Sequence, residues 1–316
     1  MEIAATSIDG FLAYWSGLHE VRGEIHSVFQ RALNIKTTGG QLISVLSSTG
    51  LDGPNTLVTD LPQNLDFVAM GLRSGMPVRL DRVGADLGQG ALCLRIGKAQ
   101  KWWPRLAGGA QRLDWTRLKR NLRAILKNLP SREFEEGLGE LLYLVDEMVS
   151  GRWNEVSGQR LNRLTRQALP GMKDLLAGTL EGDEILLERG IHQLVGLGTG
   201  LTPSGDDVLM GFAGTLNVVS RRVGSPEMED VLDIIACHLR ALKSNTTFVS
   251  GNLLSYACAG RVSSPILSVI RAVMFQRPSQ ACSAAEDLMS LGGNSGCEVL
   301  LGILLAISLT PRLAER

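Results

Sequence analysis

The stretch at residues 196–214 constrains the fold of this chain most, and it reads GLGTGLTPSGDDVLMGFAG. Its three alternating glycines can take positive φ and, without a Cβ, let backbone N–H groups approach a ligand closely. Pro203 suits the first turn of a helix, and the hydroxyls of Thr202 and Ser204 can cap the exposed N–H groups there. The stretch therefore predicts a glycine loop, a capped helix start and a buried helix. That is the geometry of an anion site.

The charge balance of the chain bounds the class of partner. Its 316 residues hold 32 Lys and Arg against 32 Asp and Glu, so no overall field favours nucleic acid or an anionic membrane. The N-terminus lacks a basic segment followed by an apolar one, which predicts no signal peptide. The longest apolar stretches, 208–219 and 299–309, fall short of the about 20 residues that span a bilayer, so we expect buried helices there.

The cysteines and histidines indicate the cellular compartment and limit the kinds of metal site that the chain could form. The five cysteines are widely spaced and form no C-x-x-C pair, which favours reduced thiols in a cytoplasmic protein over disulfides or zinc. The four histidines form no local ligand pair, so we expect no metal site built on histidine. No cofactor motif is present, and the cofactor stays unknown.

The first third of the chain differs from the rest in its residue pattern. Several short β-prone segments alternate with turn clusters, which predicts a small β-sheet or barrel-like domain over residues 1–110. Phe11, Tyr14 and Trp15 indicate a short docked helix before it. The expected strands are 25–29, 41–46, 56–58, 76–80 and 91–96, and the expected turn clusters are 37–40, 52–55 and 84–90.

Helical periodicity dominates residues 111–316, so the fold class is α+β, with a larger, mainly α-helical second domain. Residues 115–129 place apolar side chains on one face and basic ones on the rest, and that basic set either faces an anion or is solvated. Pro130, Gly171, Gly182 and Pro265 are expected breaks between helices. The further helices expected are 132–149, 158–168, 172–180, 183–195, 227–243, 247–259, 264–276, 280–290 and 296–309.

A weak internal repeat helps to distinguish the roles of the acidic residues in the motif. The sequence SGDDVLMG from Ser204 recurs as SGCEVLLG from Ser295. In both copies an acid follows the serine by three positions, as in a capping box, so Asp207 and Glu298 are either helix caps or functional acids. Asp206 has no acidic counterpart. We therefore place it first as general base or, if a divalent metal binds, as its ligand, with Asp207 as the second catalytic candidate.

Small polar residues around the two motifs are the candidate anion ligands. Glycine amides and a helix dipole suit phosphate or carboxylate, although a tight structural turn is the alternative. The loop lacks the lysine of a phosphate-binding Walker loop and the spacing of a dinucleotide fingerprint. Between two apolar helices, Asn245 and Thr246 offer either helix capping or hydrogen bonds to substrate. The candidate set is Gly198, Gly200, Thr202, Ser204, Gly205, Asn245, Thr246, Asn294 and Ser295.

The first motif closely resembles the signature of the family that contains the third (H) subunit of oxamate carbamoyltransferase. The resemblance covers most of 185–310 and extends more loosely into the N-terminal part. It implies a role in anaerobic allantoin use, where a multi-subunit enzyme interconverts oxalurate plus phosphate with oxamate plus carbamoyl phosphate. A small anionic substrate, and other subunits of a complex or self-association, are the implied partners. Further matching stretches are 247–250 with Leu254, Ala257 and Gly260, then Ser264 and Pro265, then 291–302.

The chain departs from the family pattern in the second motif. Family members often show Gly-His-Thr-Ser-Gly, whereas residues 292–296 read Gly-Gly-Asn-Ser-Gly. Gly293 and Asn294 thus replace the usual histidine and threonine, and the lost histidine could carry a proton or bind phosphate, which leaves the substrate open.

Two alternatives to a carbamoyltransferase subunit remain at this point. An ATP-dependent small-molecule kinase would use the glycine loop and early aspartate in a ribokinase-like turn, but that fold needs a large central sheet. In a non-catalytic assembly subunit, the glycines would serve close helix packing.

Overall fold

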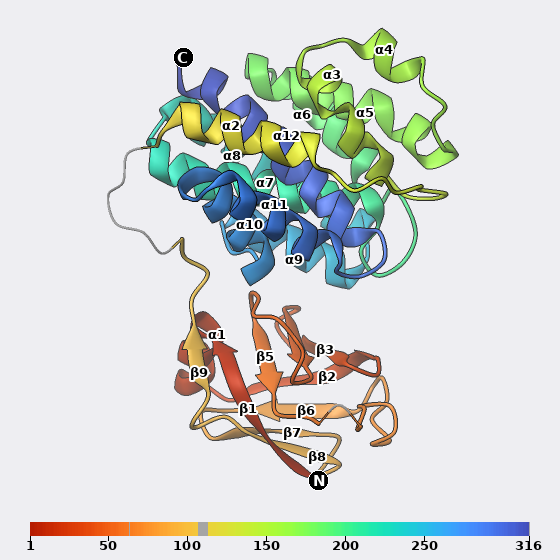
Figure 1. Cartoon of the computed structure of the whole chain (residues 1–316). Coiled ribbons are helices and arrows are strands. Elements are labelled where there is room, and N and C mark those ends of the chain that lie inside the picture. The colour runs from red at the N-terminus through yellow and green to blue at the C-terminus, as the bar shows by residue number, and fades with distance from the viewer. Residues whose placement is uncertain (63, 107–112, 316) are drawn as a thin grey trace. The chain divides into compact units, whose positions relative to one another are not determined.

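The structure is a computed structural model that describes residues 1–62, 64–106 and 113–315. The chain divides into two compact units, Met1–Arg105 and Leu106–Arg316, with the strands in the first and most of the helices in the second (Figure 1). The α+β class expected from the sequence is confirmed. The boundary expected between residues 110 and 111 lies outside the described residues.

The first unit is a barrel-like sheet. Its strand order is β5-β4-β3-β2-β6-β7-β8-β1-β9, and the sheet closes because β1 pairs with β8 on one side and with β5 on the other. Alternate residues of strands such as β6 and β8 are buried and exposed, so one face of the sheet forms the core. The strands described are β1 (Glu2–Asp9), β2 (Val21–Val28), β3 (Ala32–Thr37), β4 (Leu42–Leu46), β5 (Thr56–Thr59), β6 (Pro77–Leu80), β7 (Gly84–Leu87), β8 (Leu92–Arg95) and β9 (Gln100–Trp102).

The first unit differs from expectation at four strands and agrees at its helix. Residues 10–18 form α1 (Gly10–Leu18), capped by the Asp9 carboxylate. The strands β1, β3 and β9 were not expected, and the predicted turn at 84–90 was wrong in its first half, because Gly84 begins β7. There the glycine lets two strands approach closely, since a Cβ would overlap the carbonyl oxygen of Leu94. The turn itself uses Gly88 and Gly90, both at positive φ.

The second unit is helical over its described residues. One long helix, α5, replaces two expected helices, and the break predicted at Gly171 was wrong. Gly171 instead faces α6, where an added Cβ would lie 3.0 Å from the Cβ of Gln193. The helix predicted at 132–149 was also wrong over its first part, where residues 132–138 are irregular. The elements are α2 (Trp115–Lys127), η1 (Gly139–Leu144), α3 (Val145–Val149), α4 (Trp153–Ser157), α5 (Arg163–Glu181), α6 (Glu184–Leu194), α7 (Ser204–Val223), α8 (Pro226–Ala241), η2 (Lys243–Asn245), α9 (Phe248–Cys258), α10 (Ser264–Phe275), α11 (Pro278–Met289) and α12 (Ser295–Ala314).

The two repeat helices, α7 and α12, pack against each other at the centre of this unit (Figure 1). Gly211 lies against the carbonyl oxygen of Val299, and Gly302 lies against that of Val208, so closely that a Cβ at either glycine would overlap the oxygen. Both pairs occupy equivalent positions in the two copies, and the contact is therefore approximately twofold symmetric. The helix α12 is long and apolar enough to cross a membrane, but 83% of that window is buried inside the unit, as in a core helix.

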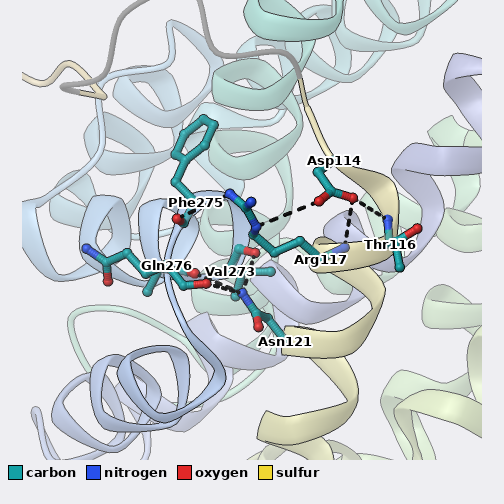
Figure 2. Close-up of polar contacts among 8 residues, drawn as sticks. Asp114, Thr116, Arg117, Asn121, Val273, Phe275 and Gln276 are labelled. Atoms are coloured by element: carbon teal, nitrogen blue, oxygen red, sulfur yellow. Dashed lines mark hydrogen bonds and ion pairs between the residues drawn. The ribbon is translucent and has the colours of Figure 1, made fainter.

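The basic helix α2 is fastened to the end of α10 (Figure 2). The side-chain amide of Asn121, which is fully buried, donates to the carbonyls of Ala272, Val273 and Gln276. The Asp114 carboxylate caps the N-terminus of α2. These carbonyls at the end of α10 thereby gain donors that the helix itself does not provide.

Candidate functional site

The two repeat helices exchange their serine and acid partners. The hydroxyl of Ser295, at the start of α12, lies close enough to the carboxyl of Asp207 on α7 to lower its pKa. In return, the hydroxyl of Ser204, at the start of α7, lies close enough to the carboxyl of Glu298 on α12 to lower its pKa. Neither helix has a side-chain cap hydrogen bond, so of the two alternatives for these acids the capping box is not formed. Each acid therefore interacts with the serine at the start of the opposite helix and does not cap its own helix.

Burial changes the charge state of these two acids. The pKa of Asp207 is raised to about 8, mainly by burial and in smaller part by the negative charges of Glu298 and Asp206, against the opposing effect of the Ser295 and Thr202 hydroxyls. Burial also raises the pKa of Glu298, which accepts a hydrogen bond of 2.9 Å from the backbone N–H of Leu138. At neutral pH Asp207 is thus largely protonated. Its Oδ2 has no hydrogen-bond partner among the described residues.

Asp206, the first catalytic candidate, lies in a different setting. Its side chain is buried, and Oδ1 accepts the backbone N–H of Gly196 at 2.8 Å. Oδ2 accepts the hydroxyls of Thr246 and Ser250. The carboxylate therefore ties the first glycine of the loop to the segment leading into α9, and three donors already surround it.

Part of the glycine loop leaves its backbone N–H groups without a partner among the described residues. Gly196, Gly198 and Gly200 all have positive φ, at 73°, 118° and 93°. Within the described residues, the amides from 198 to 201 donate to no protein group. Gly198 lies so close to the start of α7 that an added Cβ would be 2.7 Å from the Ser204 nitrogen. A row of free amides at a helix N-terminus is a ready anion cradle.

A pocket of about 630 Å³ opens where these elements meet. The N-terminal residues of α5, α7 and α12 all line it, together with part of the glycine loop and the irregular segment before η1. Three helix N-termini add partial positive charge to one cavity. The lining residues are Glu135, Glu136, Gly137, Asn162, Arg163, Leu164, Gln167, Gly198, Thr199, Thr202, Ser204, Asn294, Ser295 and Glu298.

The pocket brings together only some of the expected site residues. Gly198, Thr202, Ser204, Asn294 and Ser295 line it. The remaining candidates do not: Gly200, Gly205, Asp206, Asp207, Asn245 and Thr246.

Those outlying candidates have structural contacts of their own. Gly205 packs against the carbonyl of Leu194, and the hydroxyl of Thr246 bonds to Asp206. Asp207 stands behind the pocket residues Ser295 and Thr202, which it meets through their hydroxyls.

Sequence reasoning missed the wall that α5 and residues 135–137 contribute. The side-chain oxygen of Asn162 caps α5 by accepting the N–H of Thr165, and its amide holds the carbonyl of Gly137. Asn294 donates to the carbonyl of Glu136, which joins this wall to α12. The irregular segment carries no motif, so the sequence offered no signal for it beyond the Asn162 cap.

The described residues contain no group of three or more His, Cys, Asp or Glu side chains that could hold a metal ion. Asp206, the one metal ligand considered from the sequence, is occupied by hydroxyl and amide donors, which a metal ligand set does not include.

Comparison with known families decides the membership of the chain. A family model described as oxamate carbamoyltransferase subunit AllH matches residues 194–307, and a model of the AllH family N-terminal domain matches residues 4–101. The chain belongs to the AllH family. Both glycine motifs fall inside the first AllH match, and the second covers the barrel-like sheet except for the first two residues of β1 and the last residue of β9. AllH membership supports a subunit role in oxamate carbamoyltransferase, and hence other subunits as partners. No significant match to a solved structure is found.

Proposed function

We propose that this chain is the oxamate carbamoyltransferase subunit that binds anionic reactants of the interconversion of oxalurate plus phosphate with oxamate plus carbamoyl phosphate. The observation that carries the proposal is the set of free loop amides beside a pocket lined by three helix N-termini. Such amides and dipoles favour phosphate and carboxylate groups. We further propose that the subunit works in the cytoplasm, since its cysteines are all free thiols.

The residues behind the pocket suit proton transfer. Ser204 and Ser295 present hydroxyls to the cavity, and each is backed by a buried carboxyl group from the opposite helix. Asp207, protonated at neutral pH, is a proton donor held behind Ser295. Carbamoyl transfer from oxalurate leaves an amide nitrogen that must gain a proton, and a serine between the acid and the cavity can relay it. Asp206 has a positioning role here, because it fixes the loop that carries the amides.

The two alternative functions gain less support. A ribokinase-like kinase requires a central sheet around the motif, and the described residues from 113 to 315 are helical or irregular. Close glycine packing, expected of an assembly subunit, does occur at Gly211 and Gly302. Gly198 of the loop differs from these, since it has positive φ and lines the pocket. The helix glycines and the loop glycine thus support packing and the pocket separately.

Calorimetric titration of the full chain with phosphate, carbamoyl phosphate and oxamate tests the proposal. We expect saturable binding of at least one of them. Gly198→Ala should weaken phosphate binding by about tenfold or more, because the residue has φ of 118° and an added Cβ crowds the Ser204 nitrogen. Gly182→Ala is the matched control, with φ of 69° and open space at the end of α5. Binding of none of the three anions, by the chain alone or assembled with its partner subunits, would overturn the proposal.

A further inference from the structure

Arg163 is placed where neither helix formation nor ion pairing explains it. It is the first residue of α5, next to the Asn162 cap, and it lines the pocket. A cation at a helix N-terminus opposes the helix dipole. The first turn of α5 contains no acidic residue to offset it, and the guanidinium makes no ion pair or hydrogen bond within the described residues. Arg163 is exposed, so it is free to meet a ligand.

The charges of the lining residues make Arg163 important for binding an anion in the pocket. Among the lining residues, all of which are described, Arg163 carries the one formal positive charge, whereas Glu135, Glu136 and Glu298 carry carboxyl groups. A carboxylate ligand would meet net repulsion in this cavity without an arginine to receive it. A planar guanidinium offers paired N–H donors that match the two oxygens of a carboxylate.

We infer that Arg163 is the specificity-determining residue for the carboxylate of the oxamate or oxalurate reactant, while the loop amides of Gly198 and Thr199 receive phosphate. This rests on the proposed function. The two anion subsites come from separate elements, since the amides belong to the loop before α7 and the guanidinium to α5. Two subsites in one cavity match a reaction that brings two anions together.

Titration of the full chain with oxamate and, separately, with inorganic phosphate tests the assignment. Arg163→Gln should weaken oxamate binding by about 10- to 100-fold, as for loss of a charge-assisted hydrogen-bonded pair, and change phosphate binding by less than about threefold. Gly198→Ala should do the reverse. Arg163→Lys keeps the charge but not the paired donors, so it should recover only part of the oxamate affinity. Arg166→Gln is the matched control, since Arg166 is exposed on the same helix and does not line the pocket.

The outcomes separate this inference from the function on which it rests. Weaker oxamate binding in Arg163→Gln together with weaker phosphate binding in Gly198→Ala supports two subsites. Equal loss of both anions in Arg163→Gln, or no loss of oxamate, overturns the role of Arg163 while the proposed function stands. If the wild-type chain, alone and assembled with its partner subunits, binds neither anion, the proposed function fails and the inference falls with it.

Discussion

The buried carboxyl of Asp207 should make the stability of the helical unit fall as pH rises, and Asp207→Asn should remove that dependence. The folded state holds the proton up to about pH 8, whereas an unfolded chain releases it near the ordinary aspartate pKa of 3.8. Between these values the folded state binds more protons than the unfolded one. The stability that Asp207 contributes by holding this proton is therefore fully present below about pH 4 and is lost as pH rises through 8. The neutral carboxamide has nearly the same shape and does not titrate.

The size of the effect follows from the width of that window. Each pH unit lowers the free energy of unfolding by up to about 1.4 kcal/mol, so the limit across the window is about 6 kcal/mol. At pH 8 we expect Asp207→Asn to be several kcal/mol more stable than the wild type, within that limit. Near pH 4 the difference should vanish or reverse, because both side chains are then neutral.

Urea unfolding between pH 4.5 and 8.5, followed by circular dichroism at 222 nm, measures the effect. Asp230→Asn, a change at an exposed position on α8, is the control and should leave the pH profile of the wild type intact. Glu298→Gln should remove a smaller part of the dependence, because burial raises the pKa of Glu298 as well. Parallel profiles for the wild type and Asp207→Asn would refute the assignment of a protonated Asp207.

Two further predictions concern the packing behind the pocket. Gly302→Ala should lower the free energy of unfolding by about 1–3 kcal/mol or more, because the added Cβ overlaps the Val208 carbonyl, whereas Gly17→Ala, in open space on α1, should be neutral or stabilising in the same urea assay. Asp206→Asn should cost about 1–3 kcal/mol, because its NH₂ group must face one of three donors and leave it unsatisfied; an unchanged urea midpoint at pH 7 would contradict this.

Much of the fold followed from local signals in the sequence. Proline and glycine mark the starts of α8 and α10 and the end of α5, and the apolar period located α7 and α12 within a few residues. The glycine loop was predictable because positive φ at Gly196, Gly198 and Gly200 is a local property. The helix break predicted at Gly171 was wrong because the role of this glycine is not local. Its role is a close approach between two helices, which no local pattern distinguishes from a helix break.

The candidate site was predictable in part, since its two helix starts carry the repeat. The partners of its acids were not. A serine followed three residues later by an acid has the same spacing whether the acid caps its own helix or reaches across to the other one. Only the packing of α7 against α12 decides between them. Arg163 escaped notice because its meaning comes from a pocket whose other walls lie far away in the sequence.

The exchange of serine and acid partners between α7 and α12 has a consequence for synthesis on the ribosome. When α7 emerges, Gly211 and Asp207 lack their partners on α12 until the whole run from α8 to α11 has followed. The hairpin of α5 and α6, by contrast, joins neighbours in sequence and can form at once. Contacts between distant segments slow folding. We expect α7 to be the part of the nascent chain most in need of a chaperone.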